Sequence, residues 1–201
     1  MISEKSYKPG SLYLALIHYP VINKNGDEIV SAVTNLDLHD ISRAARTYGV
    51  KAFYVVTPLD DQKSLAEKIV SHWIRGTGAT YNPIRREALE LIRIKDSLED
   101  VTEHIRSQGE GEPRTIVTCA RTHQGSISYD RFREMLNNGG PCLLIFGTAW
   151  GLSEDFISKA DYVLDSVRGQ TDYNHLSVRS AASIILDRLF RVETRNSKLE
   201  T

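Results

Sequence analysis

Short, continuous apolar runs alternate with segments of helical periodicity along most of this chain. The runs at residues 12–18, 51–57, 115–119, 141–146 and 162–164 have the length and composition of buried strands. Between these runs, apolar side chains recur every three or four positions, which is typical of amphipathic helices. Strands that alternate with helices predict an α/β fold class, with a mostly parallel sheet flanked by helices.

Capping residues mark where several of the predicted helices begin or end. Gly49 follows a helical pattern and is expected to end that helix. Ser97 and Asp100 have the spacing of a capping box at the start of another helix. Asp61 is the candidate N-cap of a third. Further helices are expected at residues 83–91, 128–136 and 176–192, with loops at 23–27, 76–83 and 109–113.

The composition is that of an ordinary globular protein and favours a single domain over residues 1–201. Of the 201 residues, 41% are hydrophobic and 25% are charged, and the formal net charge is −1. No apolar stretch has the length of a membrane span, and the amino terminus lacks the apolar core of a secretory signal. Cys119 and Cys142 fall in apolar runs, so we interpret them as buried thiols in a reducing cytoplasm.

Missing motifs exclude the most common α/β enzymes. The chain has no GxxxxGK[ST], no GxGxxG after a strand and no GxSxG, which argues against a P-loop, a standard dinucleotide site and a nucleophile elbow. There is no HExxH and the two cysteines are far apart, so no metal site is predicted. Two arginine-rich regions, at residues 75–95 and 106–133, are either solvated mixed-charge surfaces or local patches for RNA.

Three segments remain as candidates for chemistry, and the first covers residues 35–50. On a helix, His39 and Arg43 lie four positions apart and share a face, with Asn35 near the helix start. Such a face is able to bind a phosphate or to orient a nucleophile. The alternative interpretation is a capped helix with a polar outer side.

The other two segments are loops. Gly147 directly follows the apolar run that ends at Phe146, and Gly151 comes four residues later. Glycines at a strand end allow a tight turn and the close approach of a ligand. Residues 166–180 form a polar loop that runs into a helix, where backbone donors are left free. The alternatives are an ordinary turn and a capped helix start.

In combination and order, these three segments resemble the signature motifs of the SPOUT superfamily of RNA methyltransferases, the α/β-knot enzymes. The first motif has an Asn-containing turn, an arginine and a small-residue helix ending in Phe/Tyr-Gly-Val, and Arg43 takes the place of that arginine. The second is an apolar strand with a loop ending in Gly-Leu-Ser, as in residues 143–153. The third opens the last helix, as in residues 166–178. Residues 12–189 also look like a bacterial branch of SAM-dependent RNA methyltransferases.

The resemblance implies a deep trefoil knot at about residues 115–192 and S-adenosylmethionine (SAM) as the cofactor. The adenine would lie among backbone groups of three loops. The cofactor-binding residues that the resemblance implies are Thr118, Cys119, Ala120, Phe146, Gly147, Gly151, Leu152, Val167, Gly169, Asn174, His175, Leu176 and Ser177.

The resemblance also implies a function, which is methyl transfer to a nucleotide of tRNA or rRNA by a homodimer. Together with the composition and the missing motifs, this predicts a cytoplasmic enzyme that needs neither metal nor membrane. Arg43 would orient an RNA phosphate or the attacking group in a site that the partner subunit completes. His39 and Asn35 are supporting catalytic candidates, with His39 as a proton acceptor. Two alternatives are a non-catalytic RNA-binding module with a knotted fold and an unrelated nucleotide-using Rossmann-like enzyme. No additional RNA-binding domain is recognisable, so RNA recognition is expected on this domain, with residues 75–95 as a candidate surface.

Overall fold

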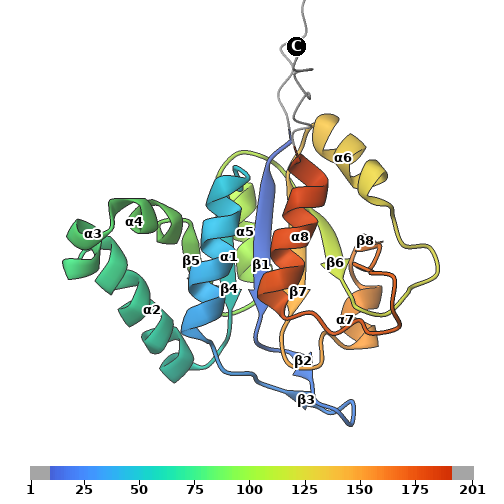
Figure 1. The fold of residues 1–201 in the computed structure, drawn as a ribbon, viewed down its shortest axis with the longest axis horizontal. Helices are drawn as coiled ribbons and strands as arrows, with labels where there is room; N and C mark the ends of the chain where they lie inside the picture. The colour runs from blue at the N-terminus through green and yellow to red at the C-terminus, as the bar shows by residue number, and fades with distance from the viewer. Residues whose placement is uncertain (1–9, 192–201) are drawn as a thin grey trace, which may run out of the picture.

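A six-stranded sheet lies at the centre of the molecule, and helices cover both of its faces (Figure 1). The computed structural model describes residues 10–191. The strands of this sheet are β1 (Leu12–Ile17), β4 (Ala52–Val56), β5 (Ile92–Lys95), β6 (Arg114–Thr118), β7 (Cys142–Gly147) and β8 (Tyr162–Leu164). Their order is β5-β4-β1-β7-β6-β8, and every neighbouring pair is parallel. The predicted α/β class with a mostly parallel sheet is therefore confirmed.

The helices connect successive strands, and a short antiparallel hairpin follows β1. The helices are α1 (Asn35–Thr47), α2 (Asp60–Ile74), α3 (Thr77–Tyr81), α4 (Pro83–Leu89), α5 (Leu98–Ser107), α6 (Tyr129–Asn137), α7 (Glu154–Ser158) and α8 (Val178–Phe190). The hairpin consists of β2 (Val21–Ile22) and β3 (Glu28–Ile29). No helix among residues 10–191 is both long and apolar enough to cross a membrane.

Both faces of the sheet are buried, which explains why its strands read as continuous apolar runs. On one face, Leu14 and its neighbours pack against α1, α2, α4, α6 and α8. On the other face, Ala15 and its neighbours pack against α5 and α7. Because side chains alternate along a strand, adjacent residues of β1 belong to the two different cores.

The strand order places a change of direction beside β1. From β1 the chain first builds outward through β4 and β5, and then crosses to the other side to form β6, β7 and β8. In open α/β sheets, ligands bind beyond the carboxyl ends of the strands at such a switch point. A ligand-binding site is therefore expected at the carboxyl ends of β1, β7 and β6.

Most predicted elements are present, with ends that differ by one or two residues. The Ser97–Asp100 capping box is formed, and Gly49 follows α1 with a φ of +72°. Asp61 is not an N-cap, because α2 begins at Asp60. Asp61 lies instead in the first turn, where a negative charge is favourable near the helix N-terminus. The predicted helix end at residue 192 and the amino-terminal residues 1–9 lie outside the described residues.

Five elements were not predicted, namely the strands β2, β3 and β5 and the helices α3 and α7. The first of the unpredicted helices, α3, lies in the segment that was expected to be a loop. The expectation of two buried thiols is confirmed for Cys142 and wrong for Cys119, which is half-buried. Cys119 follows the last residue of β6, where the chain leaves the sheet, and neither thiol is in a disulfide.

Candidate active site

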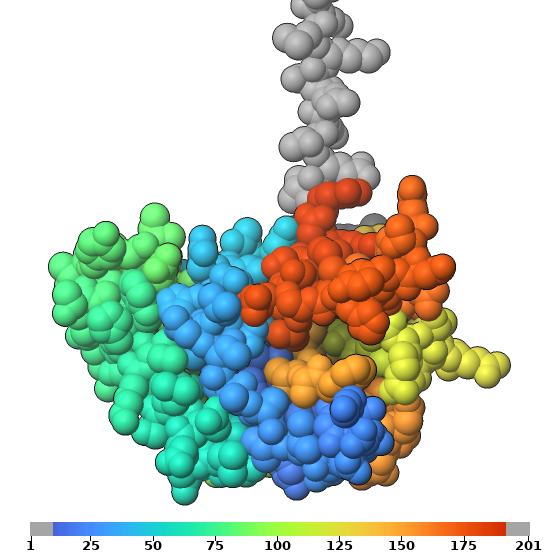
Figure 2. All heavy atoms as spheres, turned by 60° about the horizontal axis from the view of Figure 1, so that its bottom comes forward, coloured from blue at the N-terminus to red at the C-terminus, as the bar shows by residue number. Residues whose placement is uncertain are grey.

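The candidate site lies along the carboxyl ends of β1, β7 and β6. Figure 2, in which the lower side of Figure 1 comes forward, shows how segments distant in sequence meet there. Atoms of the glycine loop at residues 147–152 (orange) lie between the β2–β3 segment (blue) and the segment that leads into α8 (red-orange). These elements therefore enclose the edge at which parallel strands end.

The glycine loop is a tight turn that requires glycine. A Cβ atom on Gly147 would lie 3.0 Å from the backbone carbon of Gly151 and 3.0 Å from the nitrogen of Leu152. Gly151 has a φ of +100°, which side chains strongly disfavour, and its N–H donates to the carbonyl of Thr148 over 2.8 Å. Leu152 is buried in the core beneath α5 and α7, which fixes the far end of the loop.

Hydrogen bonds fasten this loop to β1 and to the hairpin. The Thr148 hydroxyl donates to the carbonyl of Ile17 over 2.9 Å. The Trp150 N–H donates to the carbonyl of Ile22 over 3.1 Å, and the Ile22 N–H donates to the carbonyl of Gly151 over 3.0 Å. The loop is therefore held on two sides, although the Trp150 side chain at its tip is 66% exposed.

His18 directly follows β1, is fully buried and is connected to the glycine loop through the Ser31 hydroxyl. Its Nδ1 lies 2.9 Å from the Ser31 hydroxyl, which in turn hydrogen-bonds the Thr148 hydroxyl. Burial lowers the pKa of His18 to about 4, although the carboxylate of Asp37 opposes the shift. Within the described part of the chain, the buried Nε2 atom has no hydrogen-bond partner. The imidazole is therefore neutral at neutral pH and has a structural position.

An ion pair connects the first turns of α1 and α8. Arg179 Nη1 lies 3.1 Å from Oδ1 of Asp37, which is buried, and Arg179 Nε lies 3.4 Å from Oδ2 of Asp40. The Thr34 hydroxyl donates to the second oxygen of Asp37 over 2.6 Å. Because Arg179 lies near the end of residues 166–180, this pair fixes that end of the third predicted segment.

The structure brings the three predicted cofactor segments together. The Asn174 side-chain amide donates to the carbonyl of Ala120 over 2.7 Å, which joins the segment before α8 to the loop after β6. The Thr118 hydroxyl donates to the carbonyl of Ile145 over 3.0 Å, which joins β6 to β7. Ser177 is the N-cap of α8, and its side chain accepts from the N–H of Ser180.

The remaining residues predicted for the cofactor differ in burial. Phe146 is buried in β7, and Val167 packs against the core beneath α1 and α8. Leu176 is 45% exposed, and the exposed His175 makes an edge contact with Tyr173, with 5.4 Å between ring centroids. Gly169 is exposed, and the Cys119 sulfur accepts from the Arg121 N–H. Phe146 lies within β7, Cys119 directly follows β6, and the other four residues lie in the segment between β8 and α8.

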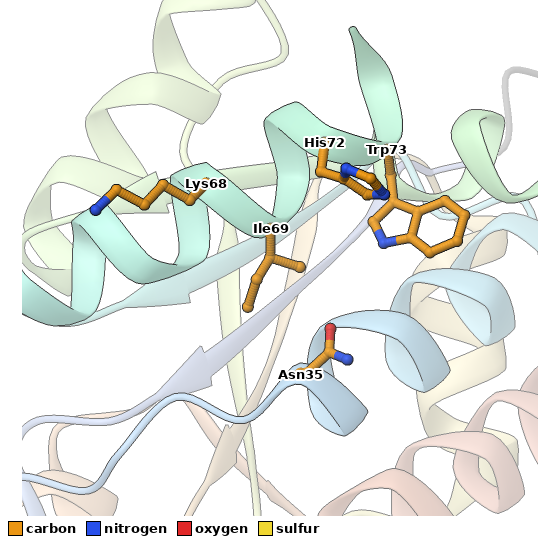
Figure 3. A pocket seen from close by; sticks show the side chains of 5 residues that line it. All are labelled: Asn35, Lys68, Ile69, His72 and Trp73. Atoms are coloured by element: carbon orange, nitrogen blue, oxygen red, sulfur yellow. The ribbon is translucent and has the colours of Figure 1, made fainter. Parts of the chain in front are cut away.

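The three predicted catalytic residues lie on another side of α1, toward α2 and α4. Asn35 lines a shallow surface hollow of about 470 Å³ beside His72 and Trp73 of α2 (Figure 3). His39 packs edge-on against Trp73 with 5.2 Å between ring centroids. Burial, and then the charge of Arg85, lowers the pKa of His39. In the described residues, no hydrogen bond or ion pair connects these side chains to the cofactor segments.

Arg43 is exposed on the outer side of α1. Its guanidinium makes no hydrogen bond or ion pair with any other residue in the range 10–191. It shares a helix face with His39, as the four-residue spacing predicts. A single chain therefore presents Arg43 to solvent instead of to its own glycine loop.

Sequence reasoning missed four residues that organise the site, namely Ser31, Asp37, Thr148 and Arg179. Three of them lie inside the segments that were singled out, and their role depends on partners far away in sequence. No sequence pattern indicated a role for Ser31, because it follows the short β2–β3 hairpin, which was itself not predicted. Among residues 10–191, no group of three or more His, Cys, Asp or Glu side chains is placed to hold a metal ion.

Comparison with known sequences gives a family match over nearly the whole described chain. Residues 11–191 match the family described as SAM-dependent RNA methyltransferase. A tRNA (guanine-N(1)-)-methyltransferase of Oleidesulfovibrio alaskensis is 42% identical over 183 residues, which are 90% of this chain and 43% of that protein. The chain thus spans less than half of this relative. An uncharacterized protein of Aquifex aeolicus is 38% identical over 181 residues, covering 90% of this chain and 88% of that one.

Solved structures share the fold at low sequence identity. A TrmH/SpoU tRNA-modifying enzyme of A. aeolicus superimposes with a TM-score of 0.52 at 17% identity, covering 92% of this chain and 75% of that chain. The SpoU methyltransferase AviRb of Streptomyces viridochromogenes, solved with AdoMet, gives a TM-score of 0.55 at 17% identity, covering 92% of this chain and 58% of that chain. These similarities identify the fold of residues 10–191 as that of the SpoU methyltransferases.

Proposed function

Because this chain belongs to the family of SAM-dependent RNA methyltransferases, we propose that it transfers a methyl group from SAM to a nucleotide of RNA. The observation that carries the proposal is the meeting of three loop segments at the carboxyl ends of β6 and β7 and the start of α8. The hydrogen bond from Asn174 to Ala120 and the anchored glycine loop hold these segments in one place.

The backbone of these segments fits a ligand with a nucleobase. Within the described residues, the N–H groups of Leu152, Val167 and Leu176 donate to no acceptor. The ring nitrogens of adenine accept such hydrogen bonds, and its amino group donates to backbone carbonyls. Gly147 and Gly151 keep the loop free of side chains where the backbone would approach the ring. Residues 118–120, 147–152 and 167–177 would therefore hold SAM.

Methyl transfer from SAM requires little acid–base catalysis by the protein. When bound, SAM supplies a methyl group on a positively charged sulfur, which is already a strong donor. What the residues of this chain contribute is alignment, which is worth several kcal/mol when the reacting atoms are held in line. The bonds from Thr148 to Ile17 and from Trp150 to Ile22 provide that rigidity, because they fix the glycine loop to β1 and the hairpin.

For the catalytic step, we propose that Arg43 orients an RNA phosphate or the attacking atom. Its guanidinium is exposed and makes no ion pair within residues 10–191, so it is available to a second molecule. Because it makes no hydrogen bond or ion pair with the glycine loop of its own chain, we propose a homodimer in which Arg43 serves the partner subunit. His39 and Asn35 lie one and two turns away on the same helix, and burial lowers the pKa of His39, which favours the neutral imidazole that a proton acceptor requires.

The RNA class is tRNA or rRNA in this proposal, and the guanine-N(1) specificity of the curated relatives is not transferred. More than half of the O. alaskensis protein has no counterpart in this chain. The activity in its name therefore describes a longer protein, and no particular nucleotide is assigned to this chain from that name.

We further propose that residues 1–201 form one cytoplasmic domain whose part from about 115 to 192 is knotted. In support of a returning path, the chain leaves edge strand β8 and comes back as α8, which packs against α1, α6 and β7. The RNA substrate and the two thiols without disulfides agree with the cytoplasm.

The function is tested with RNA from cells that lack this protein. Purified protein and methyl-labelled SAM are added to that RNA, and nucleoside mass spectrometry identifies the product. We expect one methylated nucleoside that is absent from the deletion strain. Arg43→Ala should reduce transfer roughly a hundredfold or more, while calorimetry shows unchanged SAM binding.

Arg46→Ala is the matched control, because it removes an exposed arginine less than one turn further along the same helix. It should leave transfer intact. SAM binding without transfer to any RNA would support the non-catalytic RNA-binding module. An absence of heat with SAM, together with no labelled product, would refute the proposed enzyme.

A further inference from the structure

Between Glu67 and Glu87, every charged residue of the chain is basic. This interval contains Lys68, Arg75, Arg85 and Arg86, in a protein whose formal net charge is −1. It covers the second half of α2, all of α3 and the start of α4. Figure 1 shows these three helices projecting together on the side of the sheet where β5 lies. The positive charge is therefore concentrated where α3 joins α2 and α4, whereas Asp60, Asp61 and Glu67 lie in the first half of α2 and Glu87 lies in the last turn of α4.

The basic side chains in this interval are largely uncompensated. Within residues 10–191, Lys68, Arg75 and Arg85 make no ion pair with a carboxylate. Elsewhere, exposed cations are commonly paired, as in Arg106 with Glu112 and Arg121 with Glu154. Unpaired cations leave a positive potential that attracts an anionic partner.

Trp73 holds the three helices in place. The guanidinium carbon of Arg85 lies 4.7 Å from the centre of the Trp73 ring, and the His72 ring makes an edge contact at 5.3 Å. A Cβ on Gly78 would lie 2.7 Å from Trp73 Cε3, so α3 lies directly against the indole. The positions of Arg85 and of the α3–α4 turn are therefore fixed in the free protein.

Two large side chains project from this rigid base into solvent. Tyr81, at the end of α3, is 85% exposed, and Ile84, in the first turn of α4, is 81% exposed. An exposed aromatic ring among unpaired cations is the arrangement with which proteins bind unpaired nucleotides, by stacking on bases and contacting phosphates. A fully paired helix hides the faces of its bases, so this surface favours single-stranded RNA.

The surface extends to the first residue of α1. Lys68, His72 and Trp73 line the hollow that ends at Asn35, the first residue of α1 (Figure 3). Asn35 directly follows Thr34, which hydrogen-bonds Asp37 at the carboxyl edge of the sheet. A strand of RNA on α2–α4 would therefore lead toward the same edge as the cofactor segments.

We propose that the α2–α4 surface, formed by Lys68, Arg75, Tyr81, Ile84 and Arg85, binds an unpaired segment of the RNA substrate. Tyr81 stacks on a base, while Lys68 and Arg75 contact phosphates. The proposal rests on the proposed function for the identity of the partner as RNA. Binding at this surface requires no methyl transfer, so the two are separable by experiment.

The test measures fluorescence anisotropy of a labelled, short single-stranded oligoribonucleotide and of the same sequence as a blunt duplex. We expect the single strand to bind more tightly. Tyr81→Ala should weaken that binding about tenfold, and Tyr81→Phe should restore it, because the ring face is retained. Arg75→Glu should weaken binding and reduce its dependence on salt concentration.

Lys51→Glu, directly before β4 at the opposite, amino edge of the sheet, changes the net charge by the same amount and is the matched control, because Lys51 is exposed and makes no ion pair within residues 10–191. It should bind the oligonucleotide like the unaltered protein. Calorimetry with SAM and thermal melting monitor the fold of each variant. The proposal is overturned if the unaltered protein does not bind the single strand, if the duplex binds equally well, or if Lys51→Glu weakens binding as much as Arg75→Glu.

The experiments distinguish a failure of the proposed methyl transfer from a failure of the proposed α2–α4 surface. If methyl transfer is absent but RNA binding depends on Tyr81 and Arg75, the proposed RNA-binding surface is supported and the proposed methyltransferase activity is refuted. If methyl transfer occurs and neither variant changes RNA binding, the proposed activity is supported and the proposed RNA-binding surface is refuted.

Discussion

The guanidinium of Arg179 lies 3.1 Å from the carboxylate of Asp37, and this pair ties the first turn of α8 to the first turn of α1. The two residues are 142 positions apart, so no local pattern could have joined them. The carboxylate is buried and the arginine is partly exposed. The pair fixes the point where the third cofactor segment becomes a helix.

Removing the arginine should therefore destabilise the protein. We expect Arg179→Met to lower the free energy of unfolding by about 2 kcal/mol, because a buried carboxylate loses its cation. Urea denaturation measures the change. Lys159→Met, which breaks an exposed pair within α7 and its cap, should cost less than about 0.5 kcal/mol. Equal losses in the two variants would contradict the role of Arg179.

His18 should make stability depend on pH. Its pKa in the folded protein is about 4, below the ordinary value of 6.5, so the unfolded chain binds a proton more readily between these values. Stability is therefore complete above pH 6.5 and falls as the pH is lowered toward 4, by at most roughly 3 kcal/mol. Denaturation at a series of pH values measures this slope.

His18→Gln supplies the control for that slope, since glutamine keeps a polar side chain and does not titrate. The variant should be less stable at pH 7 and should show a weaker fall between pH 6.5 and 4. His39 and His104, whose pKa values are also lowered by burial, contribute to the slope that remains. An unchanged slope would show that His18 titrates normally.

The glycine loop should not tolerate a side chain at Gly147. A Cβ there would approach Gly151 and Leu152 to 3.0 Å, so Gly147→Ala must move the loop. We expect a loss of about 2 kcal/mol in stability and a strong loss of SAM affinity. Thermal melting and calorimetry measure the two effects. Gly169→Ala has no atom within 4 Å of the new Cβ, so its stability should be unchanged.

The Thr148 hydroxyl should matter more than its methyl group. Thr148→Val keeps the shape but leaves the Ile17 carbonyl and the Ser31 hydroxyl without this partner. We expect a loss of about 1–3 kcal/mol, whereas Thr148→Ser should lose much less. Chemical denaturation of both variants distinguishes them, and a larger loss in Thr148→Ser would contradict the hydrogen-bond argument.

The sheet was predictable because its strands are buried on both faces and so appear as uninterrupted apolar runs. The strand β5 escaped prediction because it is an edge strand of four residues that includes Arg93 and Lys95. The helix α3 escaped because its five residues lie between glycine and proline, where composition favours a loop. In both cases, tertiary packing outweighs the local signal.

The candidate site was predictable in part. The parallel strands of an α/β fold end on one edge, so loops after β6 and β7 were expected to meet. The shared face of His39 and Arg43 also follows from helical spacing. What that face contacts depends on how α2 and α4 pack, and Trp73 is 34 positions from His39 along the chain. No sequence pattern specifies such a contact.

The two tryptophans of this protein lie in contrasting surroundings, and this makes each an optical probe of a different event. Trp150 is 66% exposed at the tip of the glycine loop, whereas Trp73 is half-buried beneath Arg85. In a Trp73→Phe variant, all indole emission comes from the loop, so SAM binding should shift or quench it. In Trp150→Phe, the remaining emission should respond to RNA instead. Native fluorescence thus offers two separate channels, one for each ligand, without attached dyes.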